Sequence, residues 1–229
     1  MTKYVDSYVC KLARSLRPIQ EHIIKFGGAP VFMRPVEWPL CQHSAQKMTF
    51  LAQIPLQQPI FFSRKYAMAY VFMCPGKYDH KGWLECKNWL PFSGANAVIL
   101  QEHSDMIGAG EAASEYPDYS VNFEYNPEPL IDTTDYLIDE EISSTVSEFT
   151  KIGGVPLWLQ ENETPFCPHC NQPMRFVAQF SAELDGPLPA DSSEWHGEKF
   201  KFFDFGDVGI GYMFICENEC GSAFLWQCS

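Results

Sequence analysis

The sequence predicts a strand-rich α+β fold, in which two related β-rich modules pack as pseudo-symmetric halves with a few helices. Three observations lead to this prediction: an internal duplication, short alternating apolar segments, and two cysteine pairs with metal-ligand spacing in the second copy. The chain has 229 residues, of which 46% are hydrophobic and 15% aromatic. A chain of this length and composition can bury a sizeable core.

The duplication is visible without gaps. Residues 25–56 and 151–182 align at an offset of 126, with 13 identical residues of 32. The similarity resumes at an offset of 142, where AYVFMC matches GYMFIC and Cys86 falls opposite Cys228. We therefore expect four segments: an N-terminal helix and lead-in at 1–24, the first module at 25–100, an acidic connection at 101–150, and the second module at 151–229.

The first element is expected to be a helix near the N-terminus. Val5, Val9, Leu12 and Leu16 recur at helical spacing, and Pro18 would end the helix.

Strands are expected to follow in both copies. A Gly-Gly-x-Pro turn leads into each copy, MTFLAQI and MRFVAQF alternate as half-buried strands do, and YVFMC and YMFIC suit buried strands. Between the copies, residues 135–149 predict a second helix, whose apolar side is formed by Leu137, Ile138, Ile142 and Val146.

The second copy contains the clearest chemical signal. Cys167 and Cys170 are two residues apart, and Cys216 and Cys220 follow with three residues between them, each pair in a short polar turn. Four thiolates in this arrangement predict a tetrahedral Zn²⁺ site. Reduced core cysteines and a redox dithiol are the alternatives. A four-thiolate zinc site has no open position for substrate, so we expect a structural role.

The first copy is expected to have lost its metal. It keeps Cys41 and Cys74, but Ser44 and Tyr78 stand where the second copy has its other two cysteines. Serine and tyrosine do not complete a zinc site of this kind. The other cysteines are interpreted as ordinary buried thiols: Cys10, Cys86 and Cys228.

The net charge of −13 arises in one part of the chain. Residues 88–150 contain 13 carboxylates and no Lys or Arg, whereas the other 16 acidic residues are matched by 16 basic ones. Direct binding of nucleic acid is not expected, because phosphate contacts require Lys and Arg. The segment suits a basic protein partner, and a solvated acidic face is the alternative interpretation.

No catalytic constellation emerges from the sequence. IGAGEAA matches G-x-G-x-x-A without a βαβ context, and neither a G-x-S-x-G motif nor a P-loop is present. We therefore expect a protein that is not an enzyme. No apolar run approaches the length of a membrane span and the N-terminus lacks a secretory h-region, so we expect a cytoplasmic protein with reduced cysteines.

The order and spacing of KIGGVPLWLQ, CPHCNQPMRFVAQF and FGDVGIGYMFIC…FLWQCS resemble those of the YwqG-like family, a bacterial domain of unknown function. A looser pattern resembles the eukaryotic programmed-cell-death/ribosome-assembly family of zinc-bearing chaperones. Small domains of this kind also look like immunity proteins. These resemblances imply a non-catalytic protein that binds another protein.

The resulting hypothesis is an immunity protein that covers the basic cleft of a toxin, such as a nuclease, with an acidic surface. The alternatives are an assembly chaperone for a basic client, such as a ribosomal protein, and an enzyme of unrecognised type. The candidate partner-binding residues are Glu115, Tyr116, Asp118, Tyr119, Asp132, Asp135, Tyr136, Asp139, Glu140 and Glu141.

Overall fold

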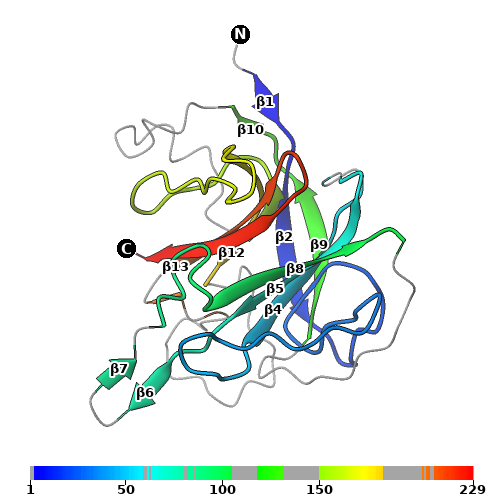
Figure 1. The fold of residues 1–229 in the computed structure, drawn as a ribbon. Helices are drawn as coiled ribbons and strands as arrows, with labels where there is room; N and C mark the ends of the chain where they lie inside the picture. Colours follow the sequence, from blue (N-terminus) through cyan, green and yellow to red (C-terminus); the bar gives the residue numbers. More distant parts are fainter. Residues whose placement is uncertain are drawn as a thin grey trace, which may run out of the picture.

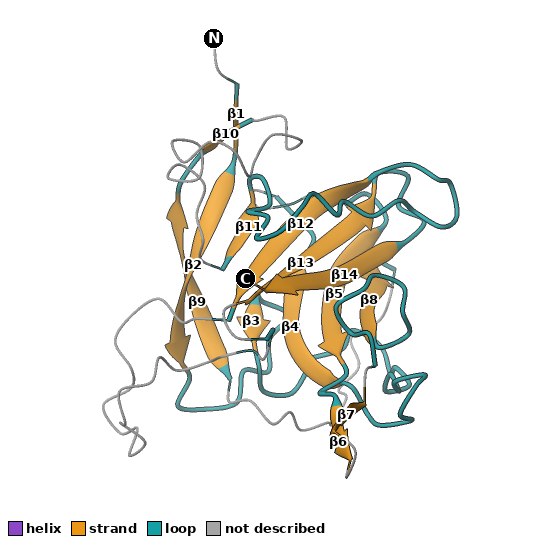
Figure 2. Ribbon diagram, turned by 90° about the vertical axis from the view of Figure 1, so that its left-hand side faces the viewer, coloured by secondary structure: helices purple, strands orange, loops and turns teal. Residues whose placement is uncertain are grey.

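The computed structural model describes residues 3–58, 61, 63–79, 82–84, 86–104, 118–130, 150–182, 203, 205–206 and 209–228. All regular elements in these ranges are strands, and none is a helix (Figure 2). The expectation of an α+β fold was therefore wrong. In the same ranges, no helix long and apolar enough to cross a membrane is found.

The N-terminal helix is replaced by a strand, β2 (Ser7–Arg14). Although the apolar residues have helical spacing, β2 pairs with one strand on each side, and Leu16 is 99% exposed rather than part of a buried stripe. Pairing with residues distant in the sequence has overridden the local pattern. The other expected helix, at 135–149, lies outside the described residues.

Ten strands form one antiparallel sheet in the order β14-β13-β12-β11-β2-β9-β3-β4-β5-β8. Besides β2, its members are β3 (Lys25–Phe26), β4 (Thr49–Pro55), β5 (Tyr66–Met73), β8 (Asn96–Glu102), β9 (Tyr119–Tyr125), β11 (Lys151–Gly153), β12 (Met174–Ser181), β13 (Gly209–Cys216) and β14 (Ser222–Cys228). Two short pairs stand apart: β1 (Tyr4–Val5) with β10 (Glu128–Pro129), and β6 (Lys77–Asp79) with β7 (Gly82–Leu84).

The sheet curls until it is nearly closed. Its end strands β14 and β8 lie beside each other (Figures 1 and 2). The hydroxyl of Ser222, at the start of β14, donates a hydrogen bond of 3.0 Å to the carbonyl oxygen of Val98 in β8. The two ends of the sheet therefore meet at the turn that connects β13 to β14.

The duplication has a direct structural counterpart. Strands β3, β4, β5 and β8 repeat in the same order as β11, β12, β13 and β14, and β2 and β9 separate the two sets in the sheet. Both β4 and β12 contain a register shift at equivalent positions, between Phe50 and Ala52 and between Phe176 and Ala178. Both sets also share one core, where the rings of Phe26 and Phe180 pack edge to face at 5.7 Å.

Equivalent side chains also make equivalent contacts in the two sets. The Tyr70 hydroxyl donates to the carbonyl oxygen of Val31 at 2.8 Å, and the Tyr212 hydroxyl donates to that of Leu157 at 2.6 Å. The sequence repeat is therefore a repeat of tertiary structure as well.

A buried ion pair recurs at equivalent lysines. Lys25 pairs with Asp118, and Lys151 pairs with Glu128 at 2.7 and 2.8 Å to the two carboxylate oxygens. Both lysines are fully buried. A buried ammonium group is tolerated only when it is paired, so each repeat requires one carboxylate from the connection between the modules.

Candidate metal centre

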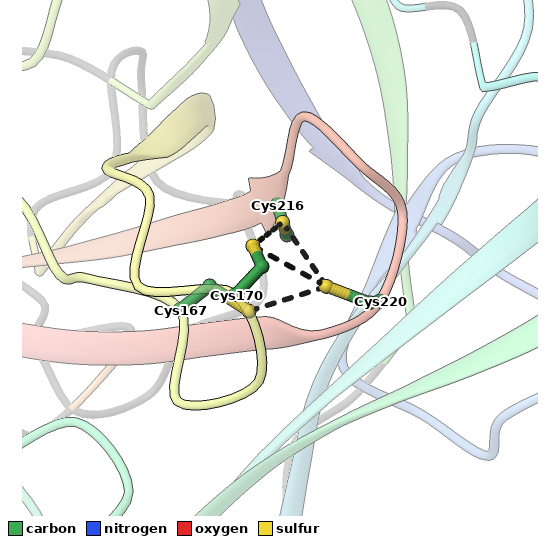
Figure 3. Close-up of side chains that lie close together, drawn as sticks. All are labelled: Cys167, Cys170, Cys216 and Cys220. Atoms are coloured by element: carbon green, nitrogen blue, oxygen red, sulfur yellow. Dashed lines mark hydrogen bonds between the residues drawn. The ribbon is translucent and has the colours of Figure 1, made fainter.

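Two turns of the second module bring four cysteines together (Figure 3). Cys167 and Cys170 belong to the turn that precedes β12, and Cys216 and Cys220 belong to the turn between β13 and β14. All four sulfur atoms lie within 4.8 Å of one another. The structure thus brings together the four ligands predicted from the sequence.

Backbone hydrogen bonds shape both turns. The amide of Cys167 donates to the Gln172 carbonyl oxygen at 2.8 Å, and the amide of Cys216 donates to that of Gly221 at 2.9 Å. Each turn also contains a residue with positive φ, Asn171 at 53° and Glu219 at 53°. These left-handed residues reverse the chain tightly enough for both sulfurs of a pair to face the same point.

Four of the six distances between these sulfur atoms are close to those of a tetrahedral zinc site. The Cys167–Cys220, Cys170–Cys216 and Cys216–Cys220 pairs are each 3.4 Å apart, and Cys220 and Cys170 are 3.6 Å apart. Bonds of about 2.3 Å from a central zinc ion place tetrahedral sulfurs about 3.8 Å apart. The four cysteines are free thiols that could hold a metal ion.

Nearby amide groups favour the thiolate forms of the first pair. The Gln172 backbone amide, followed by the Asn218 side chain at 3.6 Å, lowers the pKa of Cys170 to about 6. Burial alone would raise the pKa of Cys167, but the backbone amides of His169 and Cys170 outweigh burial and lower it.

Cys220 shows the opposite effect. Hydrogen bonds with the sulfur atoms of Cys216 and Cys167 favour the protonated thiol and raise the pKa of Cys220. A divalent cation bound at the centre would favour the thiolate form instead, because its charge attracts the negative sulfur.

The turn between β13 and β14 also holds the first module. The Glu219 carboxylate accepts hydrogen bonds from the Ser63 hydroxyl at 2.6 Å and from the amides of Arg64 and Lys65 at 2.8 and 3.1 Å. The Tyr66 hydroxyl donates to the Glu219 carbonyl oxygen at 3.0 Å. Burial alone would raise the pKa of Glu219, but the hydrogen bonds from Ser63, Arg64 and Lys65 outweigh burial. The pKa of Glu219 therefore lies below its ordinary value. Sequence reasoning missed Glu219, because its partners come from the other module.

We expect Glu219→Ala to lower the free energy of unfolding by about 1–3 kcal/mol, because a charged acceptor of three hydrogen bonds is lost. Denaturant unfolding measures the change, and hydrogen exchange should show the loss of protection in β8 and β14. Glu217→Ala is the matched control, since Glu217 is an exposed carboxylate in the same turn. Equal effects of the two substitutions would contradict the role given to Glu219.

Eight of the ten predicted partner-binding residues lie outside the described residues: Glu115, Tyr116, Asp132, Asp135, Tyr136, Asp139, Glu140 and Glu141. The other two, Asp118 and Tyr119, were expected on an exposed surface, but the structure largely buries both. Asp118 pairs with Lys25 and its side chain is 12% exposed, and Tyr119 is buried in β9. Packing, rather than partner binding, explains these two residues.

The other described acids of segment 88–150 also have lysine partners. Glu102 is 3.4 Å from Lys65, and Glu124 is 3.6 Å from Lys11. Together with Asp118 and Glu128, all four described acids of this segment pair with lysines outside it. The nine remaining acids of the segment lie in 105–117 and 131–149, and these two stretches contain no Lys or Arg.

A second cysteine group lies in the first module. The sulfur atoms of Cys41, Cys74 and Cys86 are within 4.8 Å of one another, and all three residues are buried. Sequence comparison had placed Cys86 opposite Cys228, but Cys228 lies at the end of β14 and outside this group. Cys86 is a buried free cysteine as predicted, but no sequence pattern indicated that its sulfur atom lies close to those of Cys41 and Cys74.

Comparison with known proteins adds little to these observations. No family model matches the chain. A stretch of 35 residues is 49% identical to the uncharacterized protein YpfL of Salmonella typhimurium. The match covers 15% of this chain and 8% of that protein. Neither finding bears on the resemblance to the YwqG-like family.

Proposed function

We propose that the four cysteines of the second module bind a structural zinc ion. Four thiolates in tetrahedral arrangement are a ligand set that zinc prefers, and they fill its coordination sphere. The ligands come from two turns separated by 45 residues, so the ion would fix β12 to the β13–β14 turn. Through Glu219 and Ser222, that turn also contacts the first module where the sheet closes.

On this scaffold, the protein acts as an immunity protein that neutralises a basic toxin, such as a nuclease, by binding it. The observation that carries this proposal is the set of nine carboxylates in 105–117 and 131–149, which have no Lys or Arg among them. Such a charge distribution steers a cationic protein toward the binding surface. A toxin whose cleft binds phosphates has the complementary charge.

The two acidic stretches attach to opposite ends of one strand pair. Residues 105–117 lead into β9 at Tyr119, which pairs with Arg14 at the end of β2. Residues 131–149 connect β10 to β11, and Gly153 of β11 pairs with Ser7 at the start of β2. Eight residues of strand separate these points by about 25 Å. We assign the contact to 131–149, which has six of the nine acids.

The experiment is co-expression and purification with the product of the adjacent gene, followed by a toxicity-rescue assay. Reversing Asp135, Asp139 and Glu140 to Lys should slow association by roughly tenfold or more and weaken its salt dependence. The matched control reverses Asp105, Glu111 and Glu115 to Lys. That control changes the net charge equally, at the other attachment point, and is expected to slow association less.

Two results would contradict the proposal. If the adjacent gene product neither binds nor is neutralised, the immunity function fails. If both triple variants change the association rate equally, the assignment of the contact to 131–149 fails.

A further inference from the structure

We propose that the first module binds a second zinc ion through Cys41, Cys74 and Cys86, with an exchangeable fourth ligand on the side of Ser44. The three cysteines are 1%, 0% and 2% exposed, and their sulfur atoms lie within 4.8 Å of one another. Three converging thiolates in a buried position are soft ligands suited to zinc.

The repeated scaffold positions the first of these ligands. The amide of Cys41 donates to the Gln46 carbonyl oxygen at 2.8 Å, and the amide of Ala45 donates to the Cys41 carbonyl oxygen at 2.8 Å. The same two bonds form around Cys167, also at 2.8 Å each. Ala45 has a φ of 55°, close to the 53° of its counterpart Asn171. The turn of the first module has thus kept the shape of a metal-binding turn.

The second ligand is also held as in the other module. The amide of Cys74 donates to the Ala95 carbonyl oxygen at 2.7 Å, and the amide of Cys216 donates to that of Gly221 at 2.9 Å. Ala95 is therefore the counterpart of Gly221, and Gly94 is the counterpart of the ligand Cys220.

The third ligand, Cys86, comes from a connection that differs in length between the two modules. Between Cys216 and β14 the connection has five residues, whereas between its counterpart Cys74 and β8 it has 21 and includes β6 and β7. Cys86 lies on the return of this longer connection. Asn88, two residues after Cys86, fixes this part of the connection to the end of β5. Its buried side-chain amide donates a hydrogen bond of 2.8 Å to the Cys74 carbonyl oxygen. Asn96 in turn donates to the Asn88 carbonyl oxygen at 3.0 Å.

The fourth position separates the two sites chemically. Ser44 stands where the second module has Cys170, and its hydroxyl oxygen is 3.7 Å from the Cys74 sulfur. A neutral hydroxyl or a water molecule is a weaker zinc ligand than a thiolate. The first-module ion should therefore dissociate faster than the four-thiolate ion of the second module.

Metal analysis of the full-length protein, purified under reducing conditions with zinc, tests this inference. We expect about two zinc ions per chain, released to a chromophoric chelator in one fast and one slow phase. Cys86→Ser should remove the fast phase alone and lower the content to about one zinc ion. Cys228→Ser is the matched control, because Cys228 lies outside both cysteine groups, and it should keep both phases.

A gain-of-ligand variant tests the inference independently of any loss of folding. Ser44→Cys should slow the fast phase by roughly tenfold or more, because it supplies a fourth thiolate, whereas Ser44→Ala should not slow it. A zinc content of about one that Cys86→Ser leaves unchanged, or a fast phase unaltered by Ser44→Cys, would overturn the proposal. Binding of a different metal in the first module would overturn the assignment of zinc.

Discussion

Cys220→Ser is expected to lower the free energy of unfolding by at least about 4 kcal/mol, the range reached when a structural metal is lost. Cys220 contacts the sulfur atoms of the other three ligands, at 3.4 to 3.6 Å. Without it, the turn between β13 and β14 loses its link to the turn before β12. Denaturant unfolding of the variant and of chelator-treated wild type should give similar losses of stability, because both treatments remove the proposed zinc ion.

The effect should be local before it is global. We expect hydrogen exchange to accelerate first in β13, β14 and β8, where the sheet closes, and later in β2 and β9 at its middle. Cys228→Ser controls for the loss of a thiol in β14 that is not a ligand. If chelation changes neither stability nor exchange, the ion has no structural role.

Glu128→Gln is expected to lower the free energy of unfolding by about 3–5 kcal/mol, because it leaves the Lys151 ammonium group buried without a counter-charge. Both residues are fully buried, and the carboxylate also accepts a hydrogen bond of 2.9 Å from the amide of Val155. The double variant Lys151→Met, Glu128→Leu should recover most of this loss, because no charge remains buried. The control is Lys11→Met, Glu124→Leu at an exposed pair, with an expected effect of about 1 kcal/mol or less.

The same pair predicts a pH dependence. Burial lowers the pKa of Lys151 to about 8 from 10.5, although Glu128 opposes the shift. Between these two values the unfolded chain binds more protons at this lysine than the folded chain does. Its contribution to stability should therefore increase as the pH rises from about 8 to 10.5. The difference in unfolding free energy between wild type and the double variant measures this contribution, and a difference that decreases over this range would contradict it.

The repeat and the four-cysteine site could be predicted because local sequence determines both. Similar turns and strands recur over 32 residues at an offset of 126, and Cys167 and Cys170 lie in a short turn that must bring their sulfurs together. The N-terminal strand could not be predicted in this way. Val5, Val9 and Leu12 fit a helix locally, and only pairing with β9 and β11 makes a strand of 7–14.

Cys86 was missed because sequence offsets were extended too far. The offset between the copies rises from 126 to 142 before β13, but it returns to 126 at β8 and β14. The 16 residues added before β13 in the second copy are balanced by 16 extra residues after β5 in the first. Cys86 lies in this second insertion and has no counterpart in the second copy, so its alignment with Cys228 was wrong.

The burial of two acidic residues of segment 88–150 could not be predicted, for a different reason. Composition counts carboxylates but does not show which are buried. Asp118 pairs with Lys25, and Glu128 pairs with Lys151. The position of these two lysines inside strand-forming sequence was the one indication that the interior would need carboxylates. The nine acids of 105–117 and 131–149 remain the basis of the proposed interface.

Anomalous diffraction at the zinc absorption edge, from crystals of the full-length protein grown without added metal, tests the structural account most directly. The account predicts an anomalous peak at about 2.3 Å from each of the sulfur atoms of Cys167, Cys170, Cys216 and Cys220. A fully ordered second module with no peak between these sulfurs would contradict it.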